Sequence, residues 1–233
     1  MPAQSPLRID VWRISLSAPG DPEALSAVLD ADERARAERF RFDKHRRRFI
    51  VAHAAVRGIL GLQLGLAPGA LQFAKNAHGK PFLRGEGVPV FSLSHSHEMA
   101  LCAVAACGEL GADIEWHRQL AHDDLAQRFF AEDEAAALGA LAEEDQAAGF
   151  FACWTLKEAY IKAKGLGLSL PLHSFSVTTH PRQAPLLLSS RHDPADVGRC
   201  RFWEIPVAAG YRAALAYCGD AAVPHHLDWK FPC

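Results

Sequence analysis

The feature that most constrains the fold of this chain is an order of predicted elements that occurs twice. Each half begins with a strand, continues with helices and ends with a series of strands, judged from the spacing of apolar residues. In the first half, strands are expected at 7–17, 70–75, 90–94 and 99–106, and helices at 30–39 and 44–64. In the second half, strands are expected at 111–116, 174–179, 185–189, 200–206 and 211–218, and helices at 122–142 and 145–164.

The doubled order predicts two related α+β lobes. A chain of 233 residues can form one large domain or two small ones, and either arrangement buries a core. We expect the lobes to comprise residues 1–107 and 108–233, and a site built by both lobes to lie in the cleft between them. Two helix ends are also marked: Asp30 and Glu33 predict a capping box, and Gly65 is expected to end the helix at 44–64.

The composition excludes several classes of protein. With 49% hydrophobic residues, 22% charged residues and a net charge of -2, the chain is typical of a globular protein that coats neither nucleic acid nor membrane. We expect no signal peptide and no membrane span. The cysteines form no Cys-x-x-Cys motif, and we interpret most of them as small buried apolar residues in a reducing, cytoplasmic setting. These cysteines are Cys102, Cys107, Cys153, Cys200, Cys218 and Cys233.

Two acidic residues in the strand at 111–116 are candidate metal ligands. Asp113 and Glu115 are two positions apart, so both carboxylates leave the same face of the strand. Paired acids on a strand more often form a solvated face. Their position between Leu110 and Trp116, with Ile114 pointing into the core, favours a site for Mg²⁺.

Glu158 and Lys162 are four positions apart on a predicted helix and therefore lie on one face. An ordinary surface ion pair explains that spacing equally well. The sequence also crowds Lys157, Lys162 and Lys164 around Glu158, just before Gly165. Together with the two acids on the strand, this group suits a hard cation that holds a phosphate.

Further residues suit phosphate binding. Lys80 lies in a tight Gly-Lys-Pro turn, and Ser94 and His95 lie at the end of a predicted strand, where they can donate hydrogen bonds to a phosphate. Metal binding by His95 and His97 is weakly supported, because the motif lacks a third ligand. Eight basic residues at 34–48 form either a solvated helix face or a dock for a polyanionic cofactor.

Taken together, these motifs resemble the 4'-phosphopantetheinyl transferases of the surfactin-synthetase-activating type. They occur in the family's order and span about residues 30 to 177. The matching segments are Gly79-Lys80-Pro81, Phe91-Ser92-Leu93-Ser94-His95-Ser96, Gly111-Ala112-Asp113-Ile114-Glu115, Arg128-Phe129-Phe130, Trp154-Thr155-Leu156-Lys157-Glu158-Ala159-Tyr160-Ile161-Lys162 and Gly165-Leu166-Gly167-Leu168.

The resemblance implies a pseudo-dimer fold, in which each lobe is a small, mostly antiparallel sheet packed against helices. It implies transfer of the phosphopantetheine arm of coenzyme A to a serine of an apo acyl or peptidyl carrier protein, with release of adenosine 3',5'-bisphosphate. Phe129 and Phe130 match an apolar stretch near the carrier-protein surface. The expected protein is a monomer with no nucleic-acid or membrane partner.

The resemblance also implies roles for the catalytic group. Asp113, Glu115 and Glu158 would hold Mg²⁺, or Mn²⁺, against the pyrophosphate, and Lys162 would contact the phosphates. Glu158 would serve as the base directly or by orienting a water on the metal. We favour the second role, because a carboxylate that touches Mg²⁺ and a lysine should have a low pKa.

By the same resemblance, five residues of the first lobe would bind coenzyme A. Lys80, Ser94 and His95 would contact it, His95 near the 3'-phosphate, and Arg36 and Arg48 match basic positions that approach the same phosphate. Two other classes of function stay open. A Mg²⁺-dependent nuclease needs a broader basic surface than this chain has, and a non-catalytic carrier-binding module would not need the acids and the lysine.

Overall fold

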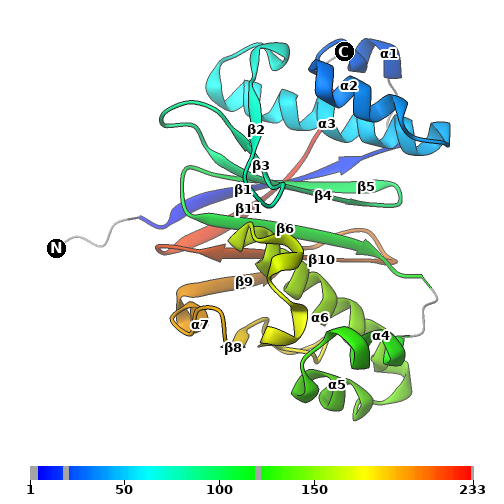
Figure 1. The fold of residues 1–233 in the computed structure, drawn as a ribbon, viewed down its shortest axis with the longest axis vertical. Helices are drawn as coiled ribbons and strands as arrows, with labels where there is room; N and C mark the ends of the chain where they lie inside the picture. Colours follow the sequence, from blue (N-terminus) through cyan, green and yellow to red (C-terminus); the bar gives the residue numbers. More distant parts are fainter. Residues whose placement is uncertain (1–4, 18–20, 119–121, 232–233) are drawn as a thin grey trace.

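Two β-sheets pack face to face at the centre of the molecule, and helices cover their outer faces (Figure 1). The computed structural model describes residues 5–17, 21–118 and 122–231. The first sheet has the strand order β11 (Ala222–Asp228), β1 (Leu7–Ser15), β5 (Met99–Ala105) and β4 (Val90–Ser96). The second has the order β6 (Glu109–Trp116), β10 (Tyr211–Cys218) and β9 (Cys200–Glu204). Two small hairpins are β2 (Phe73–Lys75) with β3 (Pro81–Leu83), and β7 (Phe175–Val177) with β8 (Leu187–Ser190).

Two long helices carry most of the contacts to the sheets. One packs on the first sheet and the other on the second, and both end at a left-handed glycine, Gly65 or Gly165. The α-helices are α1 (Pro22–Ser26), α2 (Ala31–Glu38), α3 (Asp43–Leu64), α4 (His122–Phe129), α5 (Glu132–Gly139), α6 (Glu143–Lys164) and α7 (Asp196–Arg199). The 3-10 turns are η1 (Pro68–Ala70), η2 (Gly167–Ser169) and η3 (Leu172–Ser174). No helix in the described part of the chain is both long and apolar enough to span a membrane.

Most predicted elements are present. The short helices α1 and α7 are additional to them, and three further differences concern one helix and two strands. The capping box of Asp30 and Glu33 is formed at the start of α2. The single helix expected at 122–142 is two helices, because the chain leaves the helical conformation at Ala131, which precedes α5 with extended dihedral angles. The strands β3 and β11 are additional to the predicted set.

The two sheets share a core that joins the lobes. Apolar residues of β1 and β5, such as Val11 and Leu101, pack against residues of β6 and β10, such as Ile114 and Leu215. All strand pairs are antiparallel except β1 with β11, so the expected α+β fold of two lobes with mostly antiparallel sheets is confirmed. The division at residue 107 stays a prediction. The final strand β11 returns to the first sheet, so the end of the chain adds to the first lobe.

The interpretation of the cysteines needs a correction. Cys200 and Cys218 lie directly opposite each other on β9 and β10, with 4.0 Å between their Cα atoms, and they form a disulfide. Sequence patterns miss this pair because it depends on the register of two strands. Cys102 and Cys153 are buried as expected, whereas Cys107 is exposed. Cys233 lies outside the described residues, and the cytoplasmic setting stays a prediction.

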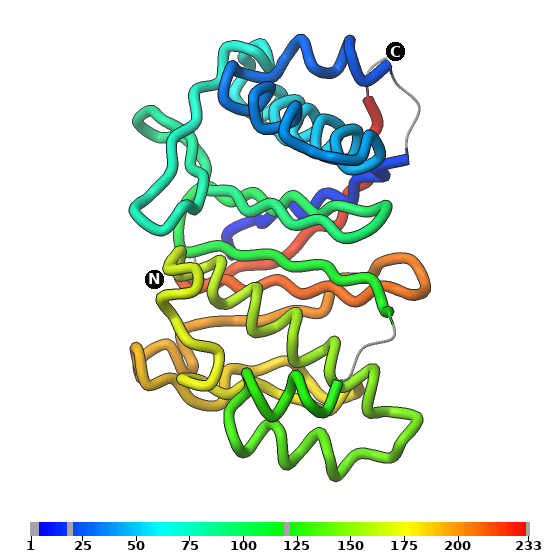
Figure 2. The backbone as a smooth tube through the Cα atoms, turned by 45° about the vertical axis from the view of Figure 1, so that its right-hand side comes forward, coloured from blue at the N-terminus to red at the C-terminus, as the bar shows by residue number. Residues whose placement is uncertain are grey.

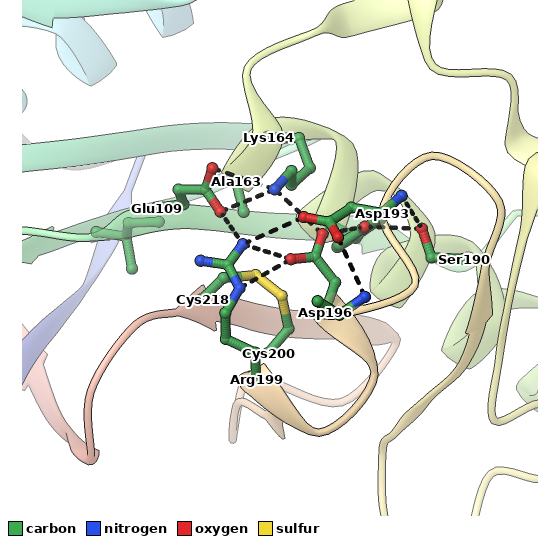
Figure 3. A network of polar contacts seen from close by, with 12 residues as sticks. Glu109, Ala163, Lys164, Ser190, Asp193, Asp196, Arg199, Cys200 and Cys218 are labelled. Atoms are coloured by element: carbon green, nitrogen blue, oxygen red, sulfur yellow. Dashed lines mark hydrogen bonds and ion pairs between the residues drawn. A yellow bond between two sulfur atoms is a disulfide. The ribbon is translucent and has the colours of Figure 1, made fainter.

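A polar network lies next to the disulfide and the C-terminal end of α6 (Figure 3). At its centre is the buried Asp196, which accepts a hydrogen bond from Tyr160 at 2.5 Å and pairs with Lys164 at 3.1 Å. Arg199 also pairs with Asp196, and its guanidinium contacts Glu109 of β6 at 2.9 Å. The network therefore ties α6 to both β6 and the segment before β9.

Candidate functional site

The predicted metal ligands Asp113 and Glu115 lie on β6, at the seam between the two sheets. Asp113 is only 2% exposed, and its Oδ1 accepts a hydrogen bond from the hydroxyl of Ser94 at 2.7 Å. The hydroxyl of Ser96 donates to Glu115 Oε2 at 2.9 Å. Both serines lie on β4 of the first sheet, so the first sheet orients two carboxylates that lie on β6 of the second sheet.

Serine side chains also hold the two strands together. β4 and β6 are edge strands of different sheets. Three serines on one face of β4 accept hydrogen bonds from alternate backbone N–H groups of β6. The pairs are Ser92 with Ala112 at 3.0 Å, Ser94 with Ile114 at 3.4 Å, and Ser96 with Trp116 at 3.1 Å. Side-chain oxygens thus take the place of a backbone ladder at the seam, and the carboxylates are fixed relative to both lobes.

α6 brings Lys162 and Glu158 to the same seam. The ammonium of Lys162 donates to Asp113 Oδ1 at 2.6 Å and to the Ser94 hydroxyl at 2.9 Å. Glu158 lies one turn earlier and lines the same cleft. Strand and helix approach closely there because β6 has Gly111, where an added Cβ would lie 2.0 Å from the carbonyl oxygen of Ala159.

Burial and the neighbouring carboxylates raise the proton affinity of the two glutamates. Burial raises the pKa of Glu158, and the charges of Asp113 and Glu115 raise it further, while Lys162 lowers it. Burial and the charge of Asp113 raise the pKa of Glu115 in the same way. The low pKa expected for Glu158 refers to a carboxylate that touches Mg²⁺, and it stays a prediction. One ammonium does not neutralise three clustered carboxylates.

The donor set fits a hard divalent cation. Asp113 Oδ2 is buried and has no hydrogen-bond partner among the described residues, although buried carboxylate oxygens normally have one. Glu115 and Glu158 are close enough to Asp113 for their pKa values to respond to its charge. An oxygen-rich, negatively charged group with an unsatisfied carboxylate oxygen suits Mg²⁺ or Mn²⁺.

The site opens into a cleft of about 640 Å3 that both lobes line. Lys80 and Phe91 of the first lobe face Glu158, Lys162 and Phe129 of the second across this volume. Arg128 and Leu168 also line it.

The two predicted partner-binding residues differ in position. Phe129 lines the cleft and is partly exposed. Phe130 is only 4% exposed and packs on Phe150 and Trp154 in the core of the second lobe. Its side chain therefore presents no surface to a partner in this structure.

The predicted coenzyme-binding lysine has an unexpected environment. The ammonium of Lys80 donates to the backbone carbonyls of Leu110 at 3.0 Å and Ala163 at 3.2 Å. Burial lowers the pKa of Lys80 to about 8, although the charge of Glu109 opposes this shift. The side chain lines the cleft, and two of the three ammonium donors are already bonded to β6 and α6.

A group of basic residues surrounds His95. Burial lowers the pKa of His95, and the positive charges of His53, Lys162, Arg36 and Arg48 lower it further. Burial disfavours any charge, but the four neighbouring positive charges favour an anion at this place.

The two predicted arginines differ in their contacts. Arg36 lies over the ring of Phe49, with 5.1 Å between its Cζ and the ring centroid, and lines a second cavity of about 360 Å3 together with His53. Arg48 is paired with Glu98. The acidic Glu33, which also lines this cavity, is bound by His53 at 2.8 Å and by Arg57 at 2.7 Å.

Two of the lysines predicted to crowd around Glu158 are elsewhere, which corrects that expectation. Lys157 is fully buried and pairs with Glu134 at 2.5 Å, on the side of α6 that faces α5 and β7. Lys164 pairs with Glu109 at 2.9 Å. Successive helical positions point about 100° apart, so neither Lys157 nor Lys164 shares the helix face of Glu158.

Comparison with known sequences supports the arrangement. A sequence model of the 4'-phosphopantetheinyl transferase superfamily matches residues 109–216, and a model of the N-terminal part of 4'-phosphopantetheinyl transferase matches residues 18–109. The chain is 42% identical over 166 residues to the 4'-phosphopantetheinyl transferase HetI of Nostoc sp., covering 69% of this chain and 70% of that protein.

Two Bacillus proteins are similar over longer segments. The chain is 30% identical over 194 residues to the 4'-phosphopantetheinyl transferase Sfp of Bacillus subtilis, covering 83% of this chain and 84% of that protein. It is 35% identical over 206 residues to the 4'-phosphopantetheinyl transferase psf-1 of Bacillus pumilus, covering 87% of this chain and 84% of that protein. The chain belongs to the 4'-phosphopantetheinyl transferase family.

Proposed function

We propose that this protein transfers the 4'-phosphopantetheine group of coenzyme A to a serine of an apo acyl or peptidyl carrier protein, releasing adenosine 3',5'-bisphosphate. The observation that carries the proposal is the grouping of Asp113 and Glu115 with Glu158 and Lys162, two residues that line the inter-lobe cleft. Membership of the family supports it. Since one chain supplies both sides of the cleft, we propose that the protein acts as a monomer.

We propose that Asp113, Glu115 and Glu158 hold Mg²⁺, or Mn²⁺, in the cleft. The unpaired Asp113 Oδ2 and the raised pKa values of the two glutamates support this assignment. When bound, the cation would neutralise charge on the pyrophosphate and on the departing bisphosphate. The serine hydroxyls of Ser94 and Ser96 keep the carboxylates oriented toward the cleft.

Lys162 and Glu158 act on the reacting groups. In this structure the ammonium of Lys162 balances the negative charge of Asp113. We propose that the ammonium turns to a phosphate oxygen when another positive charge balances that carboxylate. Glu158 accepts the proton of the attacking serine hydroxyl at its carboxylate oxygen, directly or through one water. Holding the hydroxyl in line with the β-phosphorus and neutralising the phosphates are the main catalytic effects in such transfers.

Coenzyme A would extend from Lys162 and the three carboxylates toward the first lobe. We propose that Ser94 and His95 contact it near the pyrophosphate and the 3'-phosphate, and that Arg36 and Arg48 supply positive charge for the 3'-phosphate. The positive charges that surround His95 and help to lower its pKa support an anion at this place. Release of Arg48 from Glu98 would accompany that contact.

The carrier protein would dock at the rim of the cleft. Leu168 is 97% exposed on η2 and lines the cleft, as does the partly exposed Phe129. We propose that these two side chains contact the carrier next to its serine, in place of the buried Phe130. Exposed apolar side chains that gather beside a functional cleft are typical of a surface for a protein partner.

The proposal is tested by incubating the protein with coenzyme A, Mg²⁺ and an apo carrier protein. A carrier whose mass increases by one phosphopantetheine arm is the expected product, and chelation of the metal or Asp113→Ala should abolish it. A complex without a mass gain would indicate a binding module. Metal-dependent cleavage of DNA without carrier modification would indicate a nuclease.

A further inference from the structure

The tip of the β2–β3 hairpin crosses from the first lobe to the end of α6 in the second (Figure 2). The tip comprises residues 76–80, between the two short strands. It meets α6 at Gly165, where the helix ends in a left-handed conformation with a φ of 66°. A Cβ added at Gly165 would lie 3.0 Å from Lys80 Cδ and 3.1 Å from Asn76 Nδ2, so the two elements are in close contact.

Asn76 uses both ends of its amide in this contact. Its Oδ1 accepts hydrogen bonds from the backbone N–H groups of His78 and Lys80, each at 2.9 Å, which fixes the turn. Its Nδ2 donates to the carbonyl of Gly165 at 2.7 Å. One side chain therefore shapes the hairpin tip and attaches it to α6.

Lys80 makes the second attachment and extends it to β6. Its ammonium donates to the carbonyl of Ala163, which lies in the last turn of α6, and to the carbonyl of Leu110 on β6. A positive charge is favourable at the C-terminal end of a helix, because the last carbonyls there lack helical partners. Ala163 directly follows Lys162, and Leu110 lies three residues before Asp113.

We propose that Asn76 and Lys80 form a clasp that positions Lys162 and Glu158 of α6 against the carboxylates of β6. The clasp, defined as these two side chains, rests on the proposed transferase function. It assigns Lys80 a positioning role through the backbone, in place of the direct coenzyme contact expected from the sequence. Asn76 has a role that no motif indicated, because its partner Gly165 is 89 residues away.

Two variants separate the clasp from other roles of the hairpin. Asn76→Asp keeps the oxygen that accepts from His78 and Lys80 but loses the donor to Gly165, so it opens the attachment without removing the turn. Lys80→Met keeps the apolar stem and removes the ammonium. Lys230→Met is the matched control, because Lys230 is an exposed lysine outside the cleft.

The expected result is a fall in kcat of about 10- to 100-fold for both clasp variants, because a displacement near 1 Å of catalytic groups has effects of this size. The dissociation constant for coenzyme A, measured without carrier, should change less than about threefold. Because both side chains hold the same helix end, the double variant should lose less than the product of the two single losses. Amide hydrogen exchange at 161–165 should become faster in each variant but not in the control.

Two results would overturn the clasp. One is weaker coenzyme A binding in Lys80→Met with unchanged binding in Asn76→Asp, which would make Lys80 a direct ligand. The other is an unchanged kcat per folded molecule in both variants, which would reduce the contacts to stability alone. If the wild type modifies no carrier, the proposed function fails, and unchanged exchange at 161–165 in the variants would then still refute the clasp.

Discussion

Replacement of Lys157 by methionine tests how α6 is held in the second lobe. The Lys157 ammonium is 0% exposed and donates to Glu134 Oε1 at 2.7 Å and to the carbonyl of Phe175 at 2.6 Å. It also lies 4.2 Å from the centre of the Phe175 ring. Lys157 precedes Glu158 directly but faces the opposite side of the helix from the cleft, so its loss should affect stability and leave catalysis intact.

The size of the effect follows from what remains around Glu134. Breaking a buried ion pair by removing one partner costs about 3–5 kcal/mol, because the other charge stays buried. Glu134 would keep hydrogen bonds from the backbone N–H groups of Val177 at 2.7 Å and Ala131 at 2.9 Å. We therefore expect a loss near the lower limit, about 3 kcal/mol, out of a typical total of about 5–15 kcal/mol.

The assay is urea unfolding followed by tryptophan fluorescence, with Lys230→Met as the control for loss of a lysine. The double variant Lys157→Met with Glu134→Gln should be more stable than Lys157→Met alone, because it buries no unpaired charge and keeps an amide oxygen that can accept from the backbone of Val177. Activity per folded molecule should stay within about twofold of the wild type, because neither Lys157 nor Glu134 lines the cleft. A loss below about 1 kcal/mol, or a double variant less stable than Lys157→Met, would refute this account of the pair.

Three further predictions concern the cleft and its supports. Glu158→Gln should lower kcat by at least about 100-fold in the assay with coenzyme A and apo carrier. It should also raise the unfolding temperature of the metal-free protein, because a carboxylate with a raised pKa opposes folding at pH 7. Gly111→Ala should destabilise the protein by about 3 kcal/mol or more in urea unfolding, because its Cβ would collide with the backbone of α6. Burial raises the pKa of Asp196, but hydrogen bonds from Tyr160, Arg199 and Lys164 outweigh burial and lower it overall. The stability advantage of the wild type over Asp196→Asn should thus be complete above about pH 5 and shrink as the pH falls below about 4, and an advantage that is constant from pH 7 to 3 would contradict this.

Local patterns predicted the parts of the fold that depend on neighbouring residues. The helix α3 and its end at Gly65 follow from an apolar stripe and a glycine, and the start of α2 follows from a capping box. The strand β11 was missed because Pro224 and the pair His225 and His226 interrupt the alternation of apolar residues that marks a strand. Its stability comes from parallel pairing with β1, more than 200 positions away in the sequence.

The candidate site shows the same limit. The spacing of Asp113 with Glu115, and of Glu158 with Lys162, indicated two same-face pairs. The structure brings the two pairs together, with Glu158 and Lys162 lining the cleft. Spacing did not reveal which lysine pairs with which carboxylate. The partner of Lys157 is 23 positions away on another helix, so only the tertiary structure separates this structural lysine from Lys162.

The position of the site at the seam has a physical reason. β4 and β6 are edge strands, and the N–H groups on an unpaired edge need hydrogen-bond acceptors. The serines of β4 accept from β6, and because a hydroxyl both accepts and donates, Ser94 and Ser96 also donate to the carboxylates of Asp113 and Glu115. The groups that close the seam are thus the groups that orient the acids. A mutation that loosens the contact between the lobes should therefore disturb the cleft before it unfolds either sheet.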